Sequence, residues 1–152
     1  MPEAQLDRFL VKIVVDYPSR EETIKMLKRL KTIEEWPIKP VAGPEDVALM
    51  TSIVWDIYVD DKILGYIADI IEETRKHPYV RLGGSPRAAI AMLQLSRAIA
   101  LINGRDYVIP DDVKKVAMPV LVHRVILKPE AELEGITPEN VIDDVLKKVP
   151  VP

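Results

Sequence analysis

The sequence contains no cysteine, which excludes a disulfide framework, thiolate metal sites and catalysis by a thiol. Only two histidines are present, His77 and His123, which is too few for a histidine-based metal cluster. We therefore expect no metal site in this chain. The lack of cysteine also fits a protein of a reducing compartment.

Long apolar runs are missing as well. The longest, such as Ala88–Leu95 and Ala98–Ile102, are separated by polar residues and fall short of the roughly 20 residues that a membrane-spanning helix needs. The segment Met1–Gln5 has neither the basic region nor the apolar core of a signal peptide. We therefore expect a cytoplasmic protein with no membrane insertion.

Neither sign of charge is in large excess. The 21 Lys and Arg residues are nearly balanced by 24 Asp and Glu residues, giving a net charge of -3 without a long block of one sign. This balance argues against binding of nucleic acid or an anionic membrane through bulk charge. A length of 152 residues with 48% hydrophobic residues predicts one globular domain.

One segment favours a β-strand. Residues Phe9–Tyr17 are rich in β-branched side chains, and every second residue falls on one apolar face. A buried strand needs hydrogen-bonding partners for its backbone, yet no second strand is predicted. We therefore predict an orphan strand and expect this sequence to be a piece of a larger protein, with Met1 placed directly before a segment from inside a domain.

The remaining chain favours helices, which are predicted from their caps and apolar periodicity. Ser19 and Glu22 form a capping box for a helix that runs to about Glu35, where Trp36-Pro37 ends it. Further helices are predicted at about 44–55, 60–76, 85–102, 110–123 and 137–149, with extended pieces at 57–59 and 107–109 and a loop at 79–84. The helix that begins at Pro86 is apolar almost all round and is predicted to be the buried centre of the bundle.

That same helix has an unusual beginning. The other predicted helices carry acidic residues in the first turn, as the helix macrodipole favours, whereas Gly83-Gly84-Ser85-Pro86-Arg87 places a cation there. Unpaired backbone N–H groups, a glycine-rich approach and a guanidinium together make a candidate anion site, and phosphate is the common biological anion. Alternatively, Arg87 pairs with a carboxylate such as Glu72 or Glu73 on the preceding helix. These residues alone leave both readings open.

Several blocks of sequence resemble one protein family. Gly84–Ala88, the apolar helix after it and Gly104–Val113 resemble the carboxy-terminal lid of MoxR-type AAA+ ATPases. Pro2–Phe9, followed by Tyr17-Pro18-Ser19, resembles the end of that family's ATPase core, and the similarity continues in family order to Pro152. Separate blocks in the same order are more specific than any single block.

The resemblance implies a mainly α fold, in which a helical-bundle AAA+ lid follows a single orphan β-strand from a truncated α/β core. It divides the chain into residues 1–18, the end of the core with the arginine-finger region and the last core strand; residues 19–59, a linker helix and a pre-lid helix; and residues 60–152, the lid.

The resemblance also implies roles for single residues. Arg87 matches the sensor 2 arginine, which touches the terminal phosphate of the nucleotide, and Ser85 and Gly84 would bind nucleotide beside it. Arg8 matches an arginine finger that acts in trans on the nucleotide of the neighbouring subunit. Such a finger can raise the rate of phosphoryl transfer by about 10³ to 10⁵ in related enzymes. The alternative for Arg8 is an ion pair with Asp7 or Glu3.

The sequence lacks other parts of an ATPase. There is no Gly-x-x-x-x-Gly-Lys-Ser/Thr phosphate loop and no strand ending in paired acids for magnesium. ATP with magnesium is therefore expected only in the intact parent, and this chain alone should neither hydrolyse ATP nor bind a cofactor tightly. By resemblance, the parent is a chaperone-like remodelling ATPase. Its partners would be the neighbouring subunits of a homo-oligomeric ring, and protein substrates or von Willebrand A-type domains.

Two other functions remain open at this point. One is a self-contained helical module for protein interaction, without nucleotide chemistry. The other is a helix-turn-helix protein that binds nucleic acid, which the acidic balance disfavours. Its cationic residues would be Lys114, Lys115, His123 and Arg124. We interpret His123 and Arg124 instead as part of a solvated helix end, and the pair Asp111-Asp112 as a helix cap rather than as catalytic carboxylates.

Overall fold

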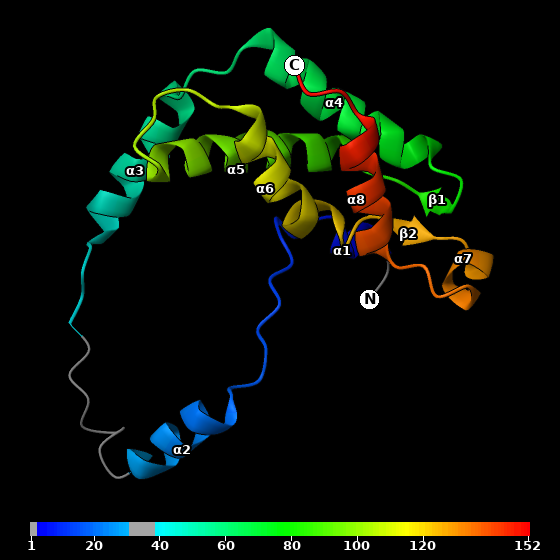
Figure 1. Ribbon diagram of the computed structural model, residues 1–152. Helices are drawn as coiled ribbons and strands as arrows, with labels where there is room; N and C mark the ends of the chain where they lie inside the picture. Colours follow the sequence, from blue (N-terminus) through cyan, green and yellow to red (C-terminus); the bar gives the residue numbers. More distant parts are fainter. Residues whose placement is uncertain (1–2, 31–38) are drawn as a thin grey trace.

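The computed structural model describes residues 3–30 and 39–152. The fold is mainly α, as predicted, with one small antiparallel sheet (Figure 1). Its elements in chain order are α1 (Glu3–Leu6), α2 (Arg20–Lys28), α3 (Pro44–Asp56), α4 (Asp61–Lys76), β1 (Val80–Leu82), α5 (Pro86–Ile102), α6 (Pro110–Leu121), β2 (Ile126–Leu127), α7 (Pro129–Leu133) and α8 (Pro138–Lys148). Within the described ranges, no helix is long and apolar enough to cross a membrane.

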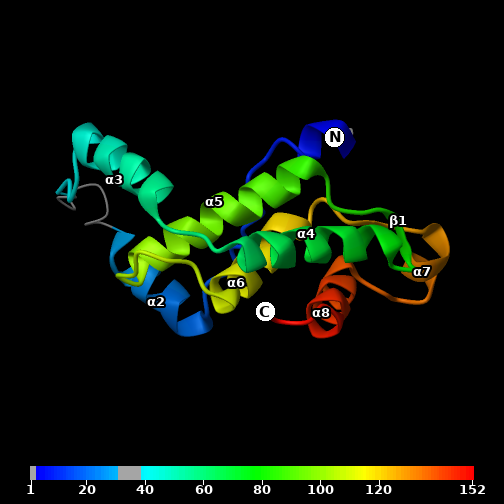
Figure 2. The same ribbon diagram turned by 90° about the horizontal axis from the view of Figure 1, so that it is seen from above.

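The core lies between α4, α5, α6 and α8, which pack against one another (Figure 2). Each helix contributes side chains that solvent does not reach, among them Ile70, Met92, Val113 and Ile142. On α4 the buried residues recur at helical spacing and form one apolar face. The apolar spacing in the sequence predicted this face, and through it α4 packs against the other helices of the core.

The predicted helix starts are confirmed by their caps. Ser19 N–H donates to the Glu22 carboxylate at 2.8 Å, and Glu22 N–H donates back to Ser19 Oγ at 3.3 Å, which completes the capping box. At the start of α4, Asp60 Oδ1 accepts from Lys62 N–H at 2.9 Å. The predicted length of the helix capped by Ser19 is wrong, because α2 ends at Lys28 with Arg29 as its C-cap, rather than near Glu35. Glu35 and Trp36-Pro37 themselves lie outside the described residues.

The prediction of an orphan strand at Phe9–Tyr17 is wrong for this structure. The segment has no strand assignment, and its side chains are largely exposed, with Val15 at 89%. It is held at one end, where Lys12 N–H donates to the Pro119 carbonyl at 2.9 Å. A β-branched pattern becomes a strand only where another strand can satisfy its backbone, and none of the described residues supplies one here.

The predicted loop at 79–84 is also wrong in part, because it contains β1. This strand pairs antiparallel with β2, and Val80 lies opposite Leu127. Both strands, and the short helix α7 after them, are too short to show a clear period in the sequence. The sheet joins the end of α4 to the chain after α6, so it fixes the loop that leads into α5.

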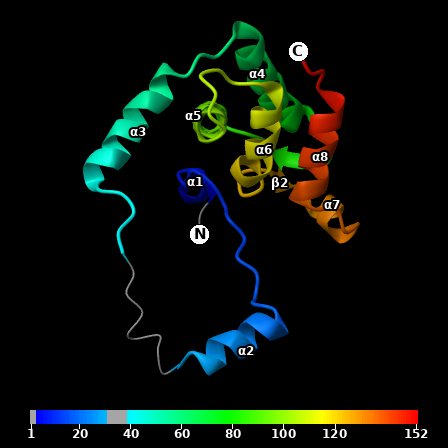
Figure 3. The same cartoon turned by 60° about the vertical axis from the view of Figure 1, so that its left-hand side comes forward.

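Helix α5 is central but not buried all round. It packs against α3, α4 and α6, while Ile90 and Ile102 remain exposed. The predicted extended pieces are confirmed, since Tyr58 and Tyr107 form a parallel bridge. In the preceding part of the chain, no residue of α2 or α3 is buried. Helix α2 also lies away from the bundle (Figure 3). The bundle that begins near Ile57 therefore forms the compact part of the molecule.

Candidate functional site

The start of α5 is built as the sequence predicts. Ser85 is the N-cap, and its Oγ accepts from Ala88 N–H at 3.3 Å. Pro86 occupies the first turn, which contains no acidic residue. The positive end of this helix therefore lacks an anion from its own first turn.

The two glycines before Ser85 have a packing role. A Cβ at Gly83 would lie 2.7 Å from the backbone nitrogen of Arg75, and one at Gly84 would lie 2.9 Å from Ile71 Cδ1. The loop thus approaches α4 more closely than any side chain would allow. Gly84 N–H donates to Thr74 Oγ1 at 2.9 Å, and its carbonyl accepts from Arg75 Nε at 2.7 Å. Both backbone groups of Gly84 are therefore already paired within the protein.

Arg87 lies in the first turn of α5, and 61% of its side chain is exposed. Its Nη1 is 4.0 Å from Asp7 Oδ2. The predicted alternative partners are wrong, because Glu72 pairs with Lys76 and Glu73 pairs with Lys148. At this distance and exposure, the contact between Arg87 and Asp7 is weak, so the guanidinium keeps most of its freedom.

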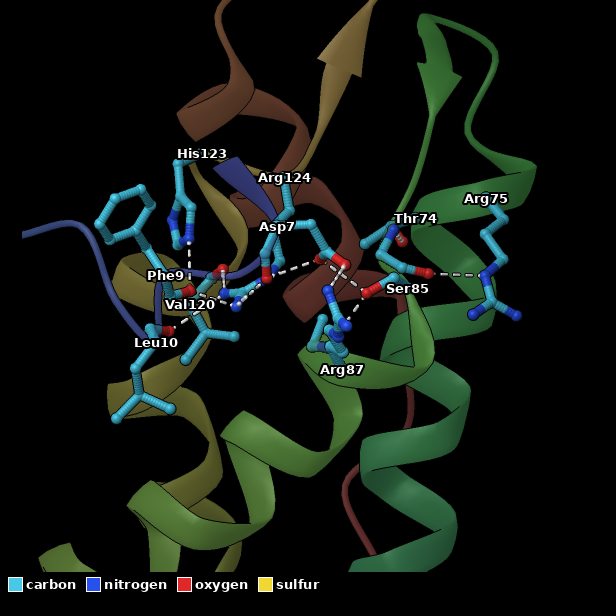
Figure 4. A network of polar contacts seen from close by, with 12 residues as sticks. Asp7, Phe9, Leu10, Thr74, Arg75, Ser85, Arg87, Val120, His123 and Arg124 are labelled. Carbon is cyan, nitrogen blue, oxygen red and sulfur yellow. Dashed lines mark hydrogen bonds and ion pairs between the residues drawn. The ribbon is translucent and has the colours of Figure 1, made fainter. Parts of the chain in front are cut away.

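Asp7 follows α1 and reaches the start of α5 (Figure 4). Ser85 Oγ donates to Asp7 Oδ1 at 2.7 Å, and Arg124 Nε donates to the same oxygen at 3.1 Å. Asp7 therefore supplies, from a distant part of the chain, the carboxylate that the first turn of α5 lacks. The ion pairs of Asp7 are with Arg124 and Arg87 rather than with Arg8, whose side chain is exposed.

Arg124 is buried, with 6% of the residue exposed, so its interpretation as part of a solvated helix end is wrong. Its guanidinium donates to the carbonyls of Asp7, Phe9, Leu10 and Val120, in addition to the Asp7 carboxylate (Figure 4). Sequence reasoning missed this role because nothing near Arg124 distinguishes it from a surface arginine. Apart from Val120, its partners are more than 100 positions away, and Asp7 is separated from it by 117.

His123 also faces the chain after α1, since its Nε2 lies 3.2 Å from the Phe9 carbonyl oxygen. Burial lowers the pKa of this imidazole, and the charges of Arg124 and Lys12 act in the same direction. The Phe9 carbonyl and Asp7 oppose them in part. His123 and Arg124 are thus turned toward their own chain, which removes two of the four cations proposed for a nucleic-acid surface.

A pocket of about 480 Å³ opens beside these residues. Charged side chains of Asp7, Arg75 and Arg124 meet apolar ones at its wall, and the full lining is Leu6, Asp7, Arg75, Leu82, Gly83, Gly84, Ser85, Pro86, His123, Arg124 and Ile126. Arg87 is the next residue in the sequence after Pro86, which lines the pocket. Among the residues that the structure describes, no group of three or more His, Cys, Asp or Glu side chains could hold a metal ion.

The pair Asp111-Asp112 has a structural explanation. Asp112 Oδ2 accepts from Ile109 N–H at 3.0 Å, which confirms the predicted cap of α6. Both Asp112 oxygens also accept from Arg105, at 2.7 and 2.8 Å. Burial raises the pKa of Asp112, but the hydrogen bonds from Arg105 and Ile109, with the Arg105 charge, outweigh it and leave the pKa below its ordinary value.

Comparison with known proteins identifies the bundle. Residues 72–145 match the AAA lid domain family. The chain is 42% identical over its whole length to the uncharacterized protein YeaC of Bacillus subtilis, covering 48% of it, and 37% identical over its whole length to chaperone MoxR1 of Mycobacterium tuberculosis, covering 42% of it.

A solved structure agrees. A protein of Cytophaga hutchinsonii, proposed to be an ATPase, superposes over the whole chain with a TM-score of 0.92 and 31% identity, and this chain covers 49% of it. The chain thus spans about half the length of the relatives it matches. The sequence blocks, the helical bundle and these matches together lead to one conclusion: the chain belongs to the MoxR family of AAA+ ATPases and carries that family's lid domain.

Proposed function

We propose that this chain is the nucleotide-sensing part of a MoxR-type AAA+ ATPase that forms a ring and remodels protein partners in the cytoplasm. ATP with magnesium would bind to a phosphate-loop domain joined to this chain. The relatives that the chain matches are about twice its length, which leaves room for such a domain. One relative is named a chaperone, which supports the remodelling role.

The observation that carries the proposal is the position of Arg87. Its guanidinium is exposed in the first turn of α5, at a helix end that has no acidic residue of its own, and lies 4.0 Å from Asp7, which lines the pocket. A planar cation that is free to move there suits the terminal phosphate of a nucleotide. We assign the sensor 2 role to Arg87 on this basis, whether it serves its own subunit or a neighbour.

Ser85 and Gly84 would assist in different ways. Ser85 carries a hydroxyl that now donates to Asp7, and the same hydroxyl could donate to a phosphate oxygen if Asp7 moved away. Gly84 would act through shape, because its backbone N–H and carbonyl are already paired with Thr74 and Arg75. Its missing side chain lets the loop pack closely against Ile71, which fixes the position where α5 begins.

Arg8 would be the arginine finger that acts in trans. Its exposed side chain follows Asp7 in the segment between α1 and Lys12. In the proposed division of the chain, residues 1–18 end the ATPase core, residues 19–59 link it to the lid, and residues 60–152 form the lid. Partners would be the neighbouring subunits of the ring, with protein substrates or von Willebrand A-type domains as targets.

The test is Arg87→Ala in the complete protein, with its phosphate-loop domain. Because 61% of the Arg87 side chain is exposed, folding should be nearly unchanged. ATP turnover should fall by about tenfold or more, since a charge that stabilises the transferred phosphoryl group is removed. Arg81→Ala, which changes an arginine outside this helix start, is the control. Turnover equal to that of the control would show that Arg87 has no part in nucleotide chemistry.

A further inference from the structure

Arg124 binds the backbone on both sides of Arg8, the candidate arginine finger. Its Nη2 donates to the carbonyl of Asp7 at 3.1 Å and to the carbonyl of Phe9, which are the residues directly before and after Arg8. Its Nη1 donates to the carbonyl of Leu10 at 3.1 Å. A single buried guanidinium thus fixes the backbone on both sides of Arg8.

The same guanidinium is anchored to the lid. Nη1 also donates to the carbonyl of Val120, which binds Arg124, in the turn after α6, to the last turn of that helix. The Asp7 carboxylate, held by Arg124 Nε, accepts from Ser85 at the start of α5 (Figure 4). The segment that carries Arg8 is therefore tied to α6 and to the helix that carries Arg87. An arginine fork suits this task, because its donors lie in one plane at fixed angles, whereas an ammonium group is a single point of charge.

We propose, resting on the function proposed above, that Arg124 and Asp7 form a latch that positions Arg8 relative to the lid. Arg124 is a positioning residue, because it acts through the backbone of the finger segment. The latch makes the helix start with Arg87 and the segment with Arg8 move as one unit. A rotation of the lid in response to one nucleotide would then displace the arginine that serves another.

The first test uses this chain of 152 residues and measures amide hydrogen exchange. The reporter is Lys12 N–H, which is bonded to the Pro119 carbonyl just beyond the latch. Asp7→Ala removes a partly exposed carboxylate, so the chain should still fold. Exchange at residues 8–12 should become about tenfold faster or more, while α4 and α5 keep their protection. Arg124→Lys, which keeps the charge but loses the fork, should have the same local effect.

Arg105→Lys is the matched control, because Arg105 also forms an arginine fork, whose described hydrogen bonds go to Asp112 and Tyr107 rather than to residues 7–10. It should not accelerate exchange selectively at residues 8–12. The latch is refuted if Asp7→Ala and Arg124→Lys leave residues 8–12 as protected as in the parent chain, or if they accelerate exchange evenly over the whole molecule, as the loss of a merely structural contact would.

The second test measures ATP turnover and ATP affinity in the complete protein. Arg124→Lys should lower turnover but not affinity, as should Arg8→Ala. If Arg8→Ala lowers turnover and Arg124→Lys does not, the positioning role is wrong while the proposed function stands. If Arg8→Ala leaves turnover unchanged, the proposed role of Arg8 is wrong, and the exchange data alone then decide whether the latch exists.

Discussion

Three arginines of this molecule have very different environments. Arg87 is exposed and only 4.0 Å from its nearest carboxylate oxygen, whereas Arg124 is buried among five acceptor contacts. Arg105 lies between these extremes and holds both oxygens of Asp112. A guanidinium that is buried and fully hydrogen-bonded stabilises one conformation, while one that is exposed and weakly paired can bind a ligand.

The Asp112 carboxylate should contribute stability that depends on pH. Because its pKa is lowered in the folded state, the contribution is fully present above about pH 4, the ordinary pKa of an aspartate. It should be lost as the pH falls through the lower folded pKa. Asp112→Asn should reduce the free energy of unfolding at pH 7 by about 2 kcal/mol and weaken the dependence below pH ~4. Urea unfolding between pH 2.5 and 7, followed by circular dichroism, measures both effects.

Asp111→Asn is the control for this prediction, because Asp111 is exposed and lies 3.8 Å from Lys114 on the same helix. Its effect at pH 7 should stay within about 0.5 kcal/mol. Equal losses from the two variants would mean that the buried pair with Arg105 adds nothing beyond an exposed one.

Helix α4 and the loop after it show how one element places another. The loop lies so close to α4 that Gly83 has no room for a methyl group, and this approach sets where α5 begins. Gly65, within α4, has no neighbouring atom within 4 Å of an added Cβ. These two glycines therefore differ in what a side chain would meet.

Gly83→Ala should destabilise the protein by about 1–3 kcal/mol, because the backbone of Arg75 blocks the new methyl group. Gly65→Ala should instead stabilise it by about 0.5–1 kcal/mol, since alanine favours a helix interior and nothing here obstructs it. Thermal unfolding of the two variants measures the difference. A Gly83→Ala protein that unfolds at the same temperature as the parent would contradict the close approach of the loop to α4.

At the level of elements, sequence patterns predicted what depends on neighbours along the chain. The bounds of α4 and α5 follow from local signals, namely the Asp60 and Ser85 caps and the apolar spacing between helix ends. The sheet of β1 and β2 could not be predicted, because each strand is short and its partner is far along the chain. For the same reason, the sequence pointed to Arg87 but gave no sign of its contact with Asp7.

The molecule as a whole consists of a packed bundle and exposed segments attached to it. All the buried apolar residues of the described chain lie between Ile57 and Val149. Helices α2 and α3 contribute none, and the α3 side chain of Trp55 instead lies 5.5 Å from the Arg97 guanidinium. The buried apolar core should therefore form without the residues that precede Ile57, although Arg124 would lose its partners in residues 7–10.

Residues 57–152 alone should fold as a cooperative unit, which would support the proposed lid boundary near residue 60. Thermal unfolding followed by circular dichroism should give a single sharp transition, because the whole apolar core is retained. A broad transition would place the boundary further toward the amino terminus and give α3, or the segment around Asp7, a part in the fold.

Arg87 is proposed to sense the terminal phosphate of a nucleotide. The most direct measurement compares the affinities of the complete protein for ADP and for a non-hydrolysable ATP analogue, with and without Arg87→Ala. The variant should bind ADP as tightly as the parent protein but lose about tenfold or more in affinity for the analogue, because only the analogue carries the phosphate that Arg87 would contact. An unchanged preference between the two nucleotides would contradict the claim and leave Arg87 as a partner of Asp7 alone.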